Sequence, residues 1–207
     1  MNKLEKFALA LHKFVPEGFQ YYLAQLIVQG QVKFKIVNGR KTKLGDCRVG
    51  PAHELPIITV NGNLNKYAFL ITALHELAHL NTFKKFGLQT SPHGLEWKNE
   101  YRSLLLPVID SNNLPKDIED ALIKTIVNIK AASCSDIQLS RILNKYDKGT
   151  MEDTLHLEDV SEGVAFSING KFFIKGKLRR SRYLCYEEGT NRPYLIHRLA
   201  KIKIDEI

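Results

Sequence analysis

The spacing of apolar residues over the first thirty positions predicts two amphipathic helices. Residues 3–14 carry apolar side chains at helical intervals, and residues 17–29 do so again. Pro16 should separate the two helices, because the residue before a proline is pushed out of the helical region. Gly30 follows the second run, where we expect it to adopt the left-handed conformation that commonly ends a helix.

Alternating apolar and polar positions then predict a small β-sheet. Residues 31–37 alternate in the way that is typical of a strand with one solvated face. The Asn38-Gly39 pair marks a turn, and two further strands are expected near residues 45–50 and 56–60.

The chain next contains a long helical segment that is apolar on nearly all sides. We expect this helix to begin at an N-cap formed by Asn63 or Asn65 and to end at Phe86, before Gly87. A third helical segment begins at Ser91-Pro92, with His93 in its first turn, and is expected to close at Pro107.

The remaining sequence changes from helical to β-type patterning. Residues 108–150 predict a helical extension, with helices at 117–129 and 136–145. Short runs at 163–168, 171–175, 182–186 and 193–197 predict antiparallel hairpins. The sequence therefore predicts an α+β fold with a core at 1–107, the helical extension at 108–150 and a β appendage at 151–207.

Composition narrows the class of protein. The chain has 207 residues, of which 44% are hydrophobic and 25% charged, as in ordinary globular proteins. It contains neither an apolar run long enough to cross a membrane nor the apolar core of a signal peptide. Cys47, Cys134 and Cys185 are far apart and form no Cys-x-x-Cys pair. We therefore expect a cytoplasmic protein with reduced thiols that acts as a monomer.

The net charge of +8 is concentrated near the C-terminus. The segment 171–203 holds ten Lys and Arg residues and two acidic residues, whereas residues 1–170 are nearly neutral. A localised basic surface is typical of a protein that binds a polyanion such as nucleic acid. The alternative is a solvated strand face that carries charge for solubility.

The central helix contains a His-Glu-x-x-His motif. His75 and His79 lie one helical turn apart on the same face, where both can bind one metal ion. Glu76 can then accept a proton from water that the metal activates. A surface helix with two unrelated histidines is the alternative, but a buried helix tolerates these polar groups only if something satisfies them. The motif indicates a zinc-dependent hydrolase, most often a peptidase.

A catalytic zinc site normally has three protein ligands, so the third ligand decides the class. The metzincin pattern is excluded, because Thr82 and Lys85 occupy its glycine and histidine positions. A thermolysin-like site would use Glu96 or Glu100 from the next helix. His93 is the other candidate, and the spacing alone leaves these choices open.

Four ordered motifs resemble the SprT-like family of zinc metalloproteases, which includes the Spartan proteases that digest proteins crosslinked to DNA. The motifs lie within about residues 15–106 and read Thr42-Lys-Leu-Gly-Asp-Cys-Arg48, Ile58-Thr-Val-Asn-Gly-Asn-Leu-Asn65, His75-Glu-Leu-Ala-His79 and His93-Gly-Leu-Glu-Trp97. The resemblance implies a zincin-like core, zinc bound by His75, His79 and His93, and Glu76 as the general base. It leaves open whether Gly94 and Trp97 support the site or only pack the core.

The sequence departs from this family at its C-terminal end. Many members carry a zinc ribbon built on Cys-x-x-Cys pairs, but here the tail contains only Cys185. We therefore expect a ribbon-like β appendage without metal that keeps a basic face, formed by Lys175, Lys177, Arg179, Arg180, Arg182 and Arg198. Aromatic residues between these cations could stack on single-stranded nucleic acid, but we expect most of them to form the hairpin core.

Two functions follow from these patterns. The first is a zinc-dependent endopeptidase for DNA-bound or DNA-crosslinked proteins, whose substrate backbone would add to the sheet edge, expected at strand 56–60. The second is a nucleic-acid-binding protein with a structural or vestigial zinc site. A structural site would need a fourth protein ligand, and we expect Cys47 to lie on a distant strand.

Overall fold

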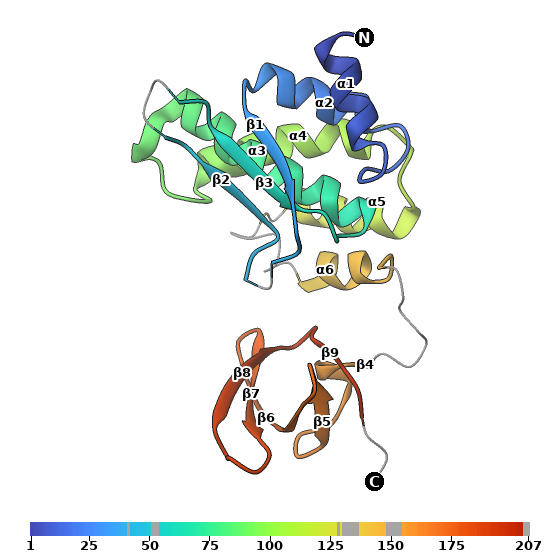
Figure 1. The fold of residues 1–207 in the computed structure, drawn as a ribbon, viewed down its shortest axis with the longest axis vertical. Helices are drawn as coiled ribbons and strands as arrows, with labels where there is room; N and C mark the ends of the chain where they lie inside the picture. The colour runs from blue at the N-terminus through green and yellow to red at the C-terminus, as the bar shows by residue number, and fades with distance from the viewer. Residues whose placement is uncertain (41, 51–53, 128, 130–136, 148–154, 205–207) are drawn as a thin grey trace. The chain divides into compact units, whose positions relative to one another are not determined.

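The computed structural model describes residues 1–40, 42–50, 54–127, 129, 137–147 and 155–204 (Figure 1). It divides into two compact units, Met1–Lys148 and Gly149–Ile207, and we describe each unit separately. Both helices and sheets are present, which confirms the α+β class. Cys134 and the beginning of the helix predicted at 136–145 lie outside the described residues.

The larger unit combines helices with a three-stranded sheet. Its helices are α1 (Lys3–Leu11), α2 (Gln20–Gln29), α3 (Lys66–Phe86), α4 (Leu95–Ile109), α5 (Lys116–Val127) and α6 (Ile137–Asn144), and a short 3-10 helix, η1, spans Gly87–Gln89. Its strands are β1 (Lys33–Val37), β2 (Gly45–Arg48) and β3 (Ile57–Asn61). Among the described residues, no helix is both long enough and apolar enough to cross a membrane.

The sheet has the order β1-β3-β2, with β1 parallel and β2 antiparallel to β3. Strand β3 is therefore the central strand, and Ile58 and Val60 on it are fully buried. The prediction that the strand at 56–60 forms the sheet edge is wrong, because both of its sides are already paired. Strand β2 is the edge strand beside helix α3, with Gly45 opposite Val60 and Arg48 opposite Ile57.

Helix α3 passes through the hydrophobic core, as its apolar pattern predicted. The Asn65 side chain accepts a hydrogen bond from the Ala68 amide and so forms the N-cap. Gly87 ends the helix with a φ of 74°, in the left-handed region that favours glycine. Phe69 and Leu74 are both fully buried although they lie on different sides of the helix, five residues apart.

Several predicted helix ends differ from the structure: α1 ends at Leu11 instead of residue 14, α2 begins at Gln20 instead of residue 17, and the predictions from Gly30 and Pro107 also differ. Gly30 has a right-handed φ of −66°, and it is Gln31 that adopts a positive φ, of 44°. Glycine is favoured at position 30 for space, because a Cβ there would lie 2.9 Å from the Leu26 carbonyl oxygen and 3.2 Å from a methyl carbon of Leu80 on α3. Pro107 does not close α4, which continues to Ile109. Burial of Val108 and Ile109 in the core offsets the hydrogen bond that the proline removes.

The smaller unit is built almost entirely from strands. Its elements are β4 (Leu155–His156), the 3-10 turn η3 (Leu157–Asp159), β5 (Ala165–Ile168), β6 (Lys171–Arg179), β7 (Arg182–Glu187), β8 (Pro193–His197) and β9 (Lys201–Ile202). Strands β5-β6-β7-β8 form an antiparallel sheet in chain order, and β4 pairs with β9. The four predicted hairpin strands are present, and Phe166, Phe173 and Cys185 fill the core beneath them.

Candidate metal centre

Three histidine side chains meet at one point beside helix α3. His75 and His79 come from adjacent turns of this helix, and His93 comes from the turn that precedes α4. The three Nε2 atoms lie 3.3 Å (His75 to His79), 3.0 Å (His79 to His93) and 3.2 Å (His75 to His93) apart. Among the described residues, this is the only cluster of histidine, cysteine and acidic groups whose arrangement could hold a metal ion.

The spacing of these nitrogens fits a tetrahedral metal ion. Zinc–nitrogen bonds of about 2.0–2.1 Å at tetrahedral angles separate the nitrogens by roughly 3.3–3.4 Å. Two of the observed distances, 3.3 and 3.2 Å, are close to this range, and the third, His79 to His93, is shorter at 3.0 Å. All three contacts join Nε2 atoms, and a ring nitrogen of a neutral imidazole is either a donor or an acceptor, so the three contacts cannot all be hydrogen bonds. A cation at their centre would satisfy all three lone pairs at once.

Burial keeps these imidazoles neutral and therefore able to bind a metal. Burial, with smaller contributions from His79 and His93, lowers the pKa of His75 to about 3. Burial and the neighbouring His93 lower the pKa of His79 to about 4, and burial also lowers the pKa of His93. At neutral pH the three side chains therefore do not need to lose protons before they bind a metal.

A local backbone turn brings His93 to the other two histidines. His93 has a φ of 60°, and α4 begins only at Leu95, with Gly94 as its N-cap residue. The prediction that His93 lies in the first helical turn is therefore wrong. The Gly94 amide donates to the Ser91 carbonyl, and a Cβ at Gly94 would lie 3.0 Å from that oxygen. Glycine thus permits the tight turn that directs His93 back toward α3.

Trp97 contacts all three histidines. Its ring centroid lies 4.7 Å from that of His75, 5.3 Å from His79 and 4.6 Å from His93. Tyr101 stacks on the indole, 5.0 Å away, and its ring centroid lies 5.6 Å from that of His75. The Nδ1 atom of His75 is buried and has no hydrogen-bond partner among the described residues. Aromatic packing, and not a carboxylate partner, therefore orients this imidazole, and Trp97 is part of the site as well as of the core.

The two glutamates that could have replaced His93 lie outside the cluster. Glu100 is buried and forms a 2.6 Å ion pair with Lys85. Glu96, in the first turn of α4, is not among the clustered metal-binding groups. The structure thus brings His93 to the metal position and neither carboxylate.

Glu76 and the three histidines line one pocket, which has a volume of about 460 Å³. Burial, together with the negative charge of Asp46, raises the pKa of Glu76 to about 7. A carboxyl group with a pKa near neutrality can both accept and return a proton. Lys43 and Arg48 hold Asp46 through ion pairs of 2.9 and 2.6 Å.

Strand β2 forms the wall of the pocket on the Glu76 side. Gly45, Asp46 and Cys47 all line the pocket, so the prediction that Cys47 lies on a distant strand is wrong. Burial, followed by the charges of Glu76 and Asp46, raises the pKa of the Cys47 thiol to about 12. This thiol is therefore protonated and uncharged where it lines the pocket, and it is not part of the histidine cluster. The sequence identified the motif at 42–48, but it did not predict that this segment lies beside Glu76.

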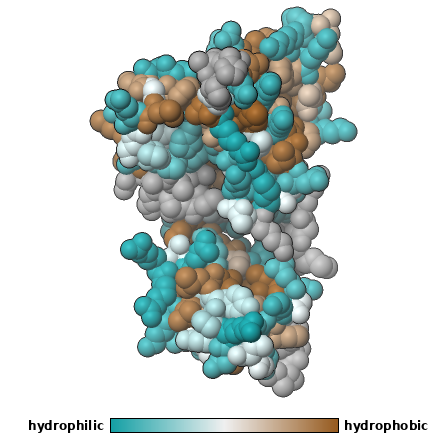
Figure 2. Space-filling model, turned by 60° about the vertical axis from the view of Figure 1, so that its left-hand side comes forward, coloured by the Kyte–Doolittle hydropathy of each residue, from teal (hydrophilic) through white to brown (hydrophobic). Residues whose placement is uncertain are grey.

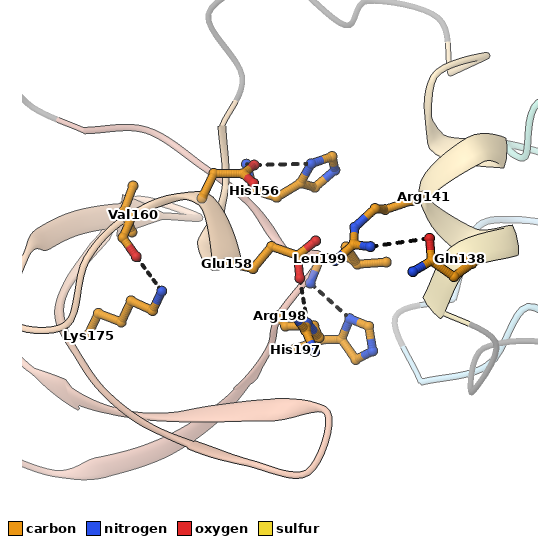
Figure 3. A network of polar contacts seen from close by, with 10 residues as sticks. Gln138, Arg141, His156, Glu158, Val160, Lys175, His197, Arg198 and Leu199 are labelled. Atoms are coloured by element: carbon orange, nitrogen blue, oxygen red, sulfur yellow. Dashed lines mark hydrogen bonds and ion pairs between the residues drawn. The ribbon is translucent and has the colours of Figure 1, made fainter.

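The six basic residues predicted to form one face are not equivalent. Lys175 is buried, and its Nζ donates to the Val160 carbonyl (Figure 3). The same Nζ lies 3.8 Å from the centre of the Tyr183 ring. Arg198 is half-buried and pairs with Glu158 (Figure 3). These two side chains hold the smaller unit together and do not belong to an exposed basic face. The four that remain exposed are Lys177, Arg179, Arg180 and Arg182.

The aromatic residues of the smaller unit also differ from the prediction that most would be core. Phe173 is buried and Tyr183 half-buried, whereas Phe172, Tyr186 and Tyr194 are 49%, 36% and 37% exposed. The sheet therefore keeps apolar side chains on its surface, and hydrophobic groups are visible on this unit in Figure 2.

Comparisons with protein-family models, with curated proteins and with solved structures give no match to this chain. The functional interpretation therefore depends on the side chains themselves. Their arrangement can hold a metal ion at three imidazoles and place a carboxyl group with a raised pKa beside it.

Proposed function

We propose that this chain is a zinc-dependent endopeptidase with a zincin-like core, related to the SprT-like proteases. The observation that carries the proposal is the convergence of three neutral imidazoles, with the Glu76 carboxyl group in the same pocket. Three nitrogen ligands leave one tetrahedral position for water or substrate, as catalytic zinc sites require. A structural site would need a fourth protein ligand, and no fourth group joins the cluster among the described residues.

Each side chain then has a specific task. His75, His79 and His93 hold the zinc ion, which supplies Lewis acidity and makes water acidic enough to ionise near neutral pH. Glu76 accepts the proton from the attacking water and delivers it to the nitrogen of the leaving amine. The raised pKa of Glu76, about 7, suits both transfers.

The substrate backbone would add to the sheet at strand β2. Strand β2 lies at the edge of the sheet and lines the pocket with Gly45, Asp46 and Cys47. An extended peptide can pair with such an edge through main-chain hydrogen bonds while its scissile carbonyl lies in the pocket. Strand β2 therefore takes the place of the strand at 56–60 as the proposed peptide-binding edge, because that strand is paired on both sides.

The decisive experiment is Glu76→Gln in the full-length protein. We expect at least a hundredfold loss of proteolysis, since general acid–base catalysis contributes about 10²–10⁴-fold. Zinc content should remain that of the wild type, because Glu76 is not a ligand in this proposal. The substrate is a DNA-binding protein. Its digestion is measured with and without single-stranded DNA, and a chelator serves as the control. Undiminished cleavage by the variant would contradict the role of Glu76.

A second candidate function, nucleic-acid binding, is favoured by the hairpin of β6 and β7. Arg179 lies directly opposite Arg182, and Arg180 occupies the turn between them with a φ of 57°. Like charges that face each other destabilise a hairpin, and no ion pair neutralises these arginines within the described part of the chain. A polyanion would relieve this repulsion, and exposed Phe172 and Tyr186 could stack on bases. Such binding would bring DNA-bound or DNA-crosslinked proteins to the protease.

Fluorescence anisotropy with a labelled single-stranded oligonucleotide tests this second function. Replacing Arg179, Arg180 and Arg182 by Gln should make the slope of log binding constant against log salt concentration shallower by about 2. Each lost phosphate contact contributes roughly 0.7 to this slope. Replacing the exposed residues Lys3, Lys6 and Lys13 removes the same charge from the larger unit and is the matched control. Equal effects of the two triple variants would mean that only net charge matters. Cytoplasmic location and a monomeric state stay predictions.

A further inference from the structure

Gly45 lies at the beginning of β2, directly against the side chain of Glu76. A Cβ at position 45 would lie 2.7 Å from Oε1 and 2.8 Å from Cγ of Glu76. It would also lie 2.8 Å from Cγ2 of Thr72, one helical turn earlier on α3. All three distances are below normal van der Waals contact, so no residue with a side chain fits here unless a neighbour moves.

The strand has little freedom to move away from the helix. Gly45 pairs with Val60 in the sheet, and the Asn61 amide next to it donates to the Leu44 carbonyl at 2.9 Å. The buried Asn61 side chain donates to the Lys43 carbonyl at 2.9 Å and accepts from Arg40 Nε at 2.9 Å. The segment that enters β2 is thus tied to Asn61 of the central strand through both its backbone and a side chain.

The helix cannot move away either. Glu76 is on α3, whose Leu74 and Leu77 are 0% and 1% exposed in the core. The group with freedom to move is therefore the Glu76 side chain from Cγ to its carboxyl end. A side chain at position 45 would displace this end and leave the imidazoles in place, because none of the close contacts involves a histidine.

We propose that Gly45 is a positioning residue for Glu76. The bare backbone at position 45 creates the space in which the carboxyl group lies when it accepts the proton from water. This inference rests on the proposed role of Glu76 as the proton acceptor. Gly45 has no contact with the proposed metal position. It affects the reaction only by leaving space for the Glu76 side chain.

Gly45→Ala in the full-length protein tests the proposal, with Gly50→Ala as the matched control. A Cβ at Gly50 would meet only Glu54, at 3.1 Å, and Glu54 is exposed and can move. In the metal-free protein labelled with ¹³C at glutamate carboxyls, the Glu76 resonance, assigned by its loss in Glu76→Gln, should shift in Gly45→Ala only. Zinc stoichiometry should stay at one in both variants. Gly45→Ala should lower kcat by about a hundredfold, as expected for an ångström-scale misplacement of a catalytic group, while KM changes less than twofold.

A second variant removes the alternative explanation that the strand is pushed by Thr72. Gly45→Ala combined with Thr72→Ser lacks the Cγ2 methyl and keeps the collision with Glu76, so kcat should remain low. Recovery of kcat in this double variant, or an unshifted Glu76 resonance in Gly45→Ala, would overturn the proposal. If the wild type shows no proteolysis, the proposed protease function fails, while the carboxyl resonance still decides whether Gly45 positions Glu76. The double variant also serves if Gly45→Ala alone does not fold.

Discussion

Replacement of Trp97 by Ala should weaken zinc binding beyond its effect on stability. The indole is 1% exposed and contacts all three imidazoles, so its removal leaves a cavity beside every ligand. The cavity should cost about 3–5 kcal/mol of unfolding free energy in the metal-free protein. Loss of groups that orient metal ligands typically weakens metal affinity by about 10–100-fold.

The two effects can be separated by measuring zinc-dependent stabilisation. At a free zinc concentration of about 100 times the wild-type Kd, zinc stabilises the folded state by about 2.7 kcal/mol. A hundredfold weaker Kd would reduce this gain to about 0.4 kcal/mol at the same concentration. Unfolding in urea with buffered zinc and with chelator, combined with competition against a zinc-sensitive dye, gives both quantities.

Leu105→Ala is the matched control, because Leu105 is fully buried on the same helix, eight residues beyond Trp97. It should cost about 2–5 kcal/mol of stability and leave the zinc affinity of the folded protein unchanged. Trp97→Phe should retain most of the affinity, since it keeps an aromatic ring against the histidines. The reasoning is refuted if Trp97→Ala and Leu105→Ala lose the same stability and both bind zinc as tightly as the wild type.

Two further predictions concern stability. The metal-free protein should lose stability as pH falls from 6.5 toward 4, because the unfolded state binds protons that the buried His75 and His79 do not, their pKa values being about 3 and 4. The raised pKa of Glu76, about 7, has the opposite effect on stability, because between pH 4.5 and 7 its carboxyl group is protonated in the folded state and ionised in the unfolded state. Glu76→Gln removes this contribution, so the unfolding free energy of the variant should fall more steeply as the pH is lowered. Urea unfolding at several pH values measures both effects. Lys175→Met should destabilise the smaller unit by about 1–3 kcal/mol, because the buried Val160 carbonyl loses its donor. The exposed Lys177→Met is its control, and equal unfolding curves for the two variants would contradict the structural role of Lys175.

Local signals in the sequence predicted the elements that carry the site. The apolar pattern of α3, the Asn65 cap and the four-residue spacing of His75 and His79 all depend on residues close together in the chain. These are the features that helical periodicity and capping chemistry determine directly. For the same reason the four hairpin strands of the smaller unit were predicted nearly at their observed positions, although β6 continues to Arg179 and the short strands β4 and β9 were not predicted.

Features that depend on long-range packing could not be read in this way. The order of β1, β3 and β2 depends on which strands meet, so the edge strand was misassigned. The φ of 60° at His93 is imposed by the turn and by packing against Trp97, and no periodicity predicts it. Lys175 did carry a signal, because alternation places it on the same side of β6 as the buried Phe173. Because lysine is rarely buried, this alternation alone does not predict that Lys175 lies inside.

In the proposed mechanism, metal binding and proton transfer depend on different parts of the fold. The proposed metal position depends on α3, the turn at His93 and the indole of Trp97. The position of Glu76, the proposed proton acceptor, depends on β2, where Gly45 lies against its side chain. Because β2 is also the sheet edge to which a peptide would add, a bound substrate would press on the strand that sets the place of the Glu76 carboxyl group. Changes in β2 should therefore alter kcat with zinc fully bound, whereas changes around Trp97 should alter zinc affinity first.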